Sequence, residues 1–498
     1  VIEWMRWREN AGSAPQHGFD ARAGGMPDPF ARPASPEDDE DDDATEDEHG
    51  GFDLELAKEI VEKAAKIGLE RLAELSEDLG SYLDNARWQL PRLNKLRNLQ
   101  DDSLISMGRT LSDQARSIGD RTFFLFRGRA FTYAEANRRV DAVVRGLIAS
   151  GIQPGQRVGV MVRSRPRHLS VAAAINRLGA IGVLLSPDTA DASIARCLEL
   201  GEAELVIVDP DNAARVRAAI KGKGSGPGPD MMILVLGGVG EVPWTPGQPR
   251  VLPDNVVDME AIDPDQVALP SWYKADPGRA RDLAMVFVTP GTHEAPRAMR
   301  ITNRRWAFSA LGAAAAATLT TRDTVYCCLP LHHPSGMLVA TGSALIGGAR
   351  LALASKPPRA GAEVDPIPFW EEIRRYGASV VYYAGEMCRK LVDAPPVLGE
   401  KNNPVRLFAG SGLRRDVWRR LIDRFGPVGV LEFYASTEAN TVLARFKFPT
   451  LAERQEQTGG TTPAPIVIIA QDGGPYYTPL RIQVQSNYVI VEADGDGR

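Results

Sequence analysis

The sequence has few cysteines and no long uninterrupted apolar run. The 498 residues include four cysteines, Cys197, Cys327, Cys328 and Cys388, without a CxxC pair. Each lies in an apolar stretch, which predicts buried free thiols in a reducing, cytoplasmic setting and argues against a disulfide scaffold or a zinc site. Residues 336–352 form the longest mainly apolar run, but glycine and serine interrupt it. It is shorter than a membrane span of roughly 20 residues, so we expect a buried helix.

The chain also lacks an excess of basic residues. It has 58 Lys and Arg against 64 Asp and Glu, a formal net charge of −6. Residues 37–48 alone hold ten acids and no basic residue, so the rest of the chain sums to −6 + 10 = +4. A nearly balanced body gives no reason to expect nucleic acid as a partner.

Composition divides the chain into three parts, of which the first two form an N-terminal extension. Residues 1–51 are rich in proline, glycine and acids, which predicts a disordered acidic tail. Residues 52–100 are predicted to be a helical extension, because apolar residues recur every three to five positions, and Pro91 is expected to end this helix. We expect the helix to pack on the body of the protein. Its alternatives are a protein partner for residues 52–90 or peripheral association with a membrane, which the mixed charge disfavours.

From about residue 101 onward, short apolar runs alternate with helical patterns. Runs rich in β-branched residues, such as Arg157–Val162 and Ile181–Leu185, are typical of strands covered on both faces. Between such runs, Tyr133–Ser150 and Ile194–Gly201 have helical periodicity. The predicted fold class is therefore a layered α/β domain.

Four segments combine residue types that suit nucleotide chemistry. Residues 288–297, VTPGTHEAPR, follow a strand and form a loop of the kind that cradles phosphates, the alternative being an ordinary strand-to-helix turn. The glycines of AGSGL, 409–413, permit a tight turn and close approach of a flat ligand. EFYASTEAN, 432–440, offers an aromatic ring, a hydroxyl and a carboxylate for Mg²⁺. LPLHHPSG, 329–336, contains two adjacent histidines, for which a structural role is the alternative.

The order of these segments resembles the core motifs of the adenylate-forming superfamily, which contains acyl-CoA synthetases, peptide-synthetase adenylation domains and luciferases. FTYAEA at 131–136 and NRLGAIGVLLSP at 176–187 belong to the same series. Residues 369–445 are similar to the fatty acid transport protein/very-long-chain acyl-CoA synthetase branch. The resemblance covers about residues 105–498 and implies that residues 101–498 are the large N-terminal domain of this fold.

The resemblance implies an activity and a set of site residues. Such enzymes join a long- or very-long-chain fatty acid to AMP from ATP, with Mg²⁺, and then pass the acyl group to CoA. By match to the motifs, Glu438 would coordinate Mg²⁺, Thr437 would bind the phosphates and His333 would lie beside the acyl carboxylate. The implied nucleotide-binding residues are Thr289, Gly291, Thr292 and Arg297 in the phosphate loop, Gly410, Ser411 and Gly412 beside adenine, and Tyr434 stacked on it.

Two departures from the family pattern lie in the phosphate loop. Pro290 stands where the family has serine and has no N–H to donate. Glu294 replaces a glycine and brings a carboxylate toward the polyphosphate, a repulsion of about 1 kcal/mol at ~4 Å in water and about 4 kcal/mol at an effective dielectric of 20. Pro290 and Glu294 together motivate an alternative function, that of a catalytically impaired pseudoenzyme or an acyl- or nucleotide-binding scaffold. An acyl-AMP ligase that donates to a carrier protein is a further alternative.

The sequence after Asn440 departs from the family as well. It contains no TGD-type motif, no hinge and no small C-terminal domain with its lysine. We therefore expect the C-terminal small domain to be missing from this chain through truncation.

Overall fold

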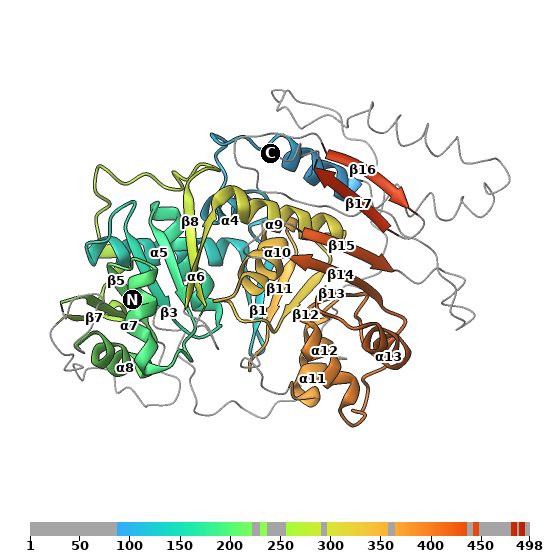
Figure 1. The fold of residues 1–498 in the computed structure, drawn as a ribbon. Coiled ribbons are helices and arrows are strands. Elements are labelled where there is room, and N and C mark those ends of the chain that lie inside the picture. The colour runs from blue at the N-terminus through green and yellow to red at the C-terminus, as the bar shows by residue number, and fades with distance from the viewer. Residues whose placement is uncertain are drawn as a thin grey trace, which may run out of the picture.

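In the part of the chain that the structure describes, helices pack against two large β-sheets (Figure 1). The computed structural model describes residues 87–221, 230–236, 255–289, 296–356, 364–435, 442–447, 480–485 and 488–493. The predicted acidic tail and the predicted helix up to residue 86 lie outside the described residues.

The first sheet has the strand order β7-β6-β5-β3-β4-β8-β9. All neighbouring strands are parallel except the edge strand β9, which is antiparallel to β8. Its strands are β3 (Arg157–Met161), β4 (Ile181–Leu185), β5 (Leu205–Val208), β6 (Met232–Val235), β7 (Val256–Asp258), β8 (Leu283–Thr289) and β9 (Arg297–Thr302). The central strands are buried along nearly their whole length, as the apolar runs predicted.

The second sheet has the strand order β15-β14-β13-β12-β10-β11-β1-β2. It is parallel from β14 to β1 and antiparallel at both edges. Its strands are β1 (Thr122–Phe126), β2 (Arg129–Thr132), β10 (Thr324–Cys327), β11 (Arg350–Leu353), β12 (Val380–Ala384), β13 (Leu407–Ser411), β14 (Gly429–Ala435) and β15 (Val442–Lys447). A separate antiparallel pair consists of β16 (Leu480–Gln485) and β17 (Tyr488–Ala493).

Helices cover both faces of each sheet. The middle layer contains α4 (Met107–Ile118), α5 (Tyr133–Ala149), α6 (Pro166–Leu178), α9 (Asn303–Ala316) and α10 (Gly342–Gly347). The outer layers are α7 (Asp191–Leu200) and α8 (Pro210–Lys221) on the first sheet, and α11 (Pro366–Tyr376), α12 (Gly385–Asp393) and α13 (Arg415–Phe425) on the second. Short 3₁₀ turns lie at Met259–Ala261 and Pro264–Gln266. The predicted layered α/β fold is confirmed.

Successive side chains of each strand point to opposite faces of the sheet, and this alternation produces the layering. In β10, Val325 and Cys327 pack into the middle core, whereas Tyr326 packs against the outer helices of the second sheet. Because successive side chains of a strand point to opposite faces, an entirely apolar strand needs a core on both sides. All four cysteines are free and buried, as the sequence predicted.

The apolar run at 336–352 is not the single buried helix that we expected. It opens with a π-helical turn, Ser335–Thr341, and continues as α10. Gly348 then takes a left-handed conformation with φ of 66°, which ends the helix, and Arg350 begins β11. Among the described residues, no helix has both the length and the apolar character that crossing a membrane requires.

Residues 87–97 are helical, so Pro91 does not end the N-terminal helix as predicted. This helix contacts the ends of α9 and α10. Arg92 is buried and donates to the carbonyl oxygens of Ala314 (3.1 Å) and Gly347 (3.4 Å). Gln89 donates to Thr318 Oγ1 at 3.0 Å. These contacts attach the described end of the extension to the body.

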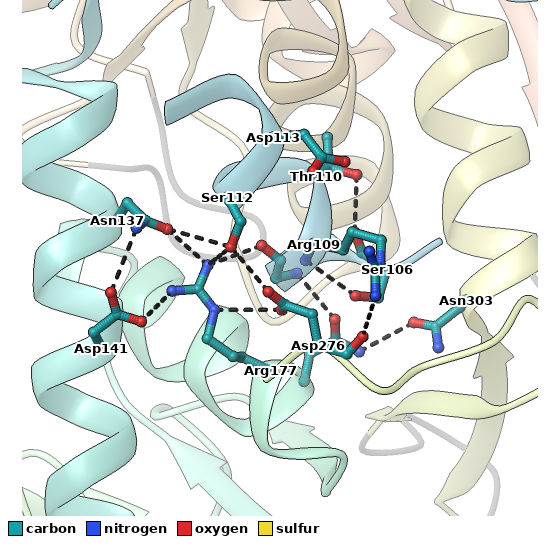
Figure 2. Close-up of polar contacts among 12 residues, drawn as sticks. Ser106, Arg109, Thr110, Ser112, Asp113, Asn137, Asp141, Arg177, Asp276 and Asn303 are labelled. Atoms are coloured by element: carbon teal, nitrogen blue, oxygen red, sulfur yellow. Dashed lines mark hydrogen bonds and ion pairs between the residues drawn. The ribbon is translucent and has the colours of Figure 1, made fainter. Parts of the chain in front are cut away.

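A polar network around Arg177 joins three helices of the middle layer (Figure 2). The guanidinium at the end of α6 contacts Asp141 on α5 (2.6 Å), Ser112 on α4 (2.7 Å) and Asp276 in the segment before β8 (3.3 Å). Because α6 runs from the carboxyl end of β3 back to the amino end of β4, Arg177 lies at the amino edge of the first sheet. The network therefore supports the scaffold at the edge opposite the candidate site.

Candidate functional site

The carboxyl ends of four parallel strands bring the predicted site segments together. In the second sheet β13 lies between β12 and β14, and β10 is the next strand. The segments 329–336 and 409–413, and residues 432–435 of the third segment, follow or end these strands, so they meet at one edge, where ligands of parallel sheets bind. The loop after β3 of the first sheet reaches the same edge, because Ser164 Oγ accepts the N–H of Leu331 at 2.9 Å.

The predicted phosphate loop connects two antiparallel strands. Thr289 ends β8 and pairs in register with Arg297, which begins β9. The Thr289 hydroxyl donates to the Arg297 carbonyl oxygen at 3.5 Å. The alternative of an ordinary strand-to-helix turn is therefore wrong, because a strand and not a helix follows. Residues 290–295, including Gly291 and Thr292, lie outside the described residues.

The backbone geometry of the 409–413 segment requires glycine at two positions. A Cβ on Gly410 would lie 2.3 Å from the Tyr383 carbonyl oxygen and 2.6 Å from the Tyr383 ring. Gly412 has φ of 85°, in the left-handed region that favours glycine. Ser411 ends β13 and pairs with Ala384. The predicted tight turn is confirmed, and binding of adenine here stays a prediction.

Glu432 is a site residue that the sequence analysis missed. Its Oε1 accepts the backbone N–H of Gly412 (2.6 Å) and of Leu413 (3.0 Å). Its Oε2 accepts the hydroxyl of Tyr383. Burial raises the pKa of Glu432, and these three donors act against that shift. The available signal was its position in β14, directly opposite Gly410 of β13.

Tyr434 lies in β14, where its backbone pairs with Leu443 of β15. The Tyr434 backbone therefore lies one residue before the carboxyl end of β14, and its stacking on adenine stays a prediction. Thr437 and Glu438, the predicted phosphate and Mg²⁺ residues, lie outside the described residues.

Two contacts with Ser335 orient His333. The His333 Nδ1 lies 2.7 Å from Ser335 Oγ and accepts the Ser335 backbone N–H at 3.3 Å. An Nδ1 that accepts a backbone N–H carries no proton, so we assign the neutral ring with its proton on Nε2. The ring is solvent-exposed, yet partial desolvation lowers its pKa, which favours this neutral form. His333 thus presents an N–H donor at the edge where the strand ends meet.

Two further histidines lie where the two sheets meet. His168 is fully buried, and its Nδ1 lies 3.1 Å from the Val162 carbonyl oxygen, so Nδ1 carries the proton and Nε2 has no partner. Burial, and then the nearby His332, lower the pKa of His168 to about 3. For His332, burial and then His333 lower the pKa to about 4, and Asp188 opposes that shift.

Acidification is therefore expected to destabilise the protein. The pH range of this effect lies between the folded and unfolded pKa values of these two histidines. Their unfolded pKa is about 6.5, above the folded values, so below pH 6.5 the unfolded state binds more protons. Stability should fall as the pH decreases from about 6.5 toward 4. Urea unfolding followed by tryptophan fluorescence measures this, and His168→Leu should flatten the decline. An equal decline in that variant would contradict the assignment.

Comparison with known proteins identifies the family. The model of the family described as "AMP-binding enzyme" matches residues 111–478, and the chain therefore belongs to this family. It is 29% identical over 379 residues to the medium/long-chain-fatty-acid–CoA ligase FadD6 of Mycobacterium tuberculosis, covering 74% of this chain and 56% of that protein. It is 28% identical over 333 residues to long-chain fatty acid transport protein 2 of Rattus norvegicus, covering 66% and 50%.

A solved structure supports the fold. The N-terminal domain of FACL13 from Mycobacterium tuberculosis aligns with a TM-score of 0.53 and 18% identity, covering 72% of this chain and 82% of that one. The adenylate-forming large-domain fold is thus confirmed. The chain spans about half the length of the curated relatives it matches.

Proposed function

We propose that this chain is the large domain of a fatty acyl-CoA synthetase, which activates a long- or very-long-chain fatty acid with ATP through acyl-AMP and passes the acyl group to CoA. Membership of the AMP-binding enzyme family and similarity to proteins named fatty-acid–CoA ligases support this proposal. The single observation that carries it is the convergence of the strand ends. It brings His333, Gly410–Gly412 and Tyr434 to one edge of the sheet.

The chemistry requires one anion, the fatty acid carboxylate, to attack the α-phosphate of another, ATP. Donors and cations must reduce the repulsion and hold the line of attack. The His333 Nε2–H is the proposed donor to the carboxylate, and Arg297 the proposed cation near the phosphates. Tyr434 and the glycine segment 410–412 are proposed to hold adenine.

Thr437 and Glu438 are proposed to bind the phosphates and Mg²⁺. Within the described residues, no three His, Cys, Asp or Glu side chains form a group that could hold a metal ion. Mg²⁺ in nucleotide sites takes one or two carboxylates together with substrate phosphates and water, so a single glutamate is a sufficient protein ligand. Bound Mg²⁺ would supply charge neutralisation at the α-phosphate.

Fatty acid-dependent exchange of pyrophosphate into ATP by the full-length protein tests the proposal. We expect exchange that depends on both Mg²⁺ and a long-chain fatty acid. Folded protein that binds Mg·ATP in calorimetry but does not catalyse exchange would instead support a scaffold or pseudoenzyme, for which Pro290 and Glu294 are the motivating observations. Adding CoA or a carrier protein then distinguishes the two proposed acyl acceptors.

His333→Ala is expected to lower the exchange rate by about 10²–10³, the cost of removing one preorganised donor at a reacting centre.

Ser335→Ala should raise KM for the fatty acid about fivefold, as loss of one hydrogen bond of about 1 kcal/mol predicts. Ser170→Ala is the matched control, because that hydroxyl donates only to a backbone oxygen of its own helix, at 3.3 Å. If the alanine variants of Ser335 and Ser170 behave alike, Ser335 does not orient His333.

The substrate class and the relatives named transport proteins raise the question of membrane contact. For residues 52–90, packing on the body stays the first proposal. Docking of a protein partner of a cytoplasmic enzyme and peripheral membrane association are the alternatives. Co-sedimentation of the chain with anionic vesicles, with and without residues 52–86, distinguishes them. Binding that requires the segment would favour the membrane.

A further inference from the structure

The glycine turn after β13 is closed on its inner side by Glu432. The carboxylate accepts two consecutive backbone N–H groups, those of Gly412 and Leu413, through one oxygen and the Tyr383 hydroxyl through the other. Burial, and then Glu432 itself, raise the pKa of Tyr383, so the phenol keeps its proton and donates it. Every polar atom of the Glu432 side chain is thus engaged inside the protein.

Consecutive N–H groups at a turn with positive φ form a concave site that attracts anions. Here that site is already filled by the protein's own carboxylate. The Gly412 carbonyl is also enclosed, because it lies close enough to α12 that a Cβ on Gly385 would sit 1.8 Å from its oxygen. Gly410 is buried, Ser411 is half-buried and Gly412 is exposed, so the accessible part of the segment is the backbone of Ser411 and Gly412. This surface lacks a free anion-binding pair, because Glu432 already accepts the N–H groups of Gly412 and Leu413.

We propose that Glu432 is a positioning and specificity residue that makes this turn a surface for an uncharged purine and excludes phosphate from it. The inference rests on the proposed function, since it assigns the adenine end of the nucleotide to this turn. Because the turn excludes phosphate, the phosphates of a bound nucleotide must lie toward Thr289 and Arg297. The nucleotide therefore binds in a single orientation. Glu432 touches no substrate and acts through the backbone of Gly412 and Leu413.

Three substitutions separate this role from simple support of the fold. Glu432→Ala frees both N–H groups. Glu432→Gln retains an oxygen for them and an amide that can donate to the Tyr383 oxygen, so it should rescue binding. Glu372→Ala is the matched control. Glu372 is buried and, like Glu432, accepts a tyrosine hydroxyl (Tyr326, 2.8 Å) and a backbone N–H (Ser355, 3.3 Å), but on other elements.

The experiment is calorimetric titration of the full chain with AMP and, separately, with inorganic tripolyphosphate. We expect Glu432→Ala to weaken AMP binding about tenfold and to gain tripolyphosphate binding, while Glu432→Gln and Glu372→Ala stay within about twofold of wild type. If Glu432→Ala does not fold, Tyr383→Phe, which keeps the ring against Gly410 and removes one donor, should weaken AMP binding two- to threefold.

The outcomes distinguish the inference from the proposed function. Wild-type chain that binds no AMP would overturn both. Wild-type chain that binds AMP, with Glu432→Ala equal to it or without gain of tripolyphosphate binding, would overturn the role of Glu432 alone. Equal weakening by Glu372→Ala would assign the effect to general loss of stability.

Discussion

Arg177→Met is expected to lower the free energy of unfolding by about 3–5 kcal/mol, the cost of leaving one partner of a buried ion pair without the other. The Arg177 side chain is 1% exposed and that of Asp276 is 8% exposed. Burial already raises the pKa of Asp276, and Arg177 is the main group that opposes this. Figure 2 shows the guanidinium enclosed by groups from α4, α5 and the segment before β8, which would lose their shared donor.

The urea midpoint, followed by circular dichroism, measures this effect. Arg116→Met is the control, because Arg116 on α4 is 72% exposed and pairs with Asp113 on the surface, where such a pair contributes within about 1 kcal/mol. The double variant Arg177→Met with Asp276→Asn should lose less than the single variant. It leaves no unpaired buried charge, and Asn tolerates the φ of 51° at position 276. Similar midpoints for Arg177→Met and Arg116→Met would contradict the account.

Gly385→Ala is expected to have the second largest effect on stability, because it places a side chain against backbone that cannot move independently. The added Cβ would lie 1.8 Å from the Gly412 oxygen and 2.2 Å from its carbonyl carbon. Either α12 or the glycine turn must shift, at a cost of about 1–3 kcal/mol. Because the turn is part of the candidate site, we expect AMP binding to be lost as well.

Gly182→Ala provides the control for this prediction. Gly182 lies in β4 with negative φ, and a Cβ there would meet its nearest neighbour, Leu184, at 3.7 Å, which is ordinary contact. Thermal unfolding and AMP calorimetry on both variants compare the two sites. Unaltered AMP affinity in folded Gly385→Ala would show that the turn does not contribute to the nucleotide site.

The elements of the fold could be predicted where local pattern and tertiary environment agree. The strands β3 and β4 and the helix α5 lie within a residue of the predicted ranges, since their apolar periodicity reports burial directly. The predictions failed at Pro91 and at residues 336–352. In the first case tertiary contacts of Arg92 and Gln89 hold a helix that contains proline, and in the second a left-handed glycine divides the run.

Some features of the candidate site could likewise be predicted from the sequence, and others could not. Motif order pointed to His333, the glycine segment and Tyr434, because that order resembles the series of motifs in the adenylate-forming superfamily. Thr437 and Glu438 remain predictions of the same kind. The Ser335 contacts that select the tautomer of His333 depend on local geometry, which residue spacing does not specify.

The linear order of residues was sufficient to determine the layered α/β class, the buried thiols and the family motifs, because each is encoded in neighbouring residues or in short periodic patterns. Tertiary structure alone decided the role of Glu432, whose partners lie 19, 20 and 49 residues away. It likewise decided the enclosure of Arg177. Such contacts arise only when parallel strands and separate helices pack together, and no local pattern records which buried charge will meet which donor.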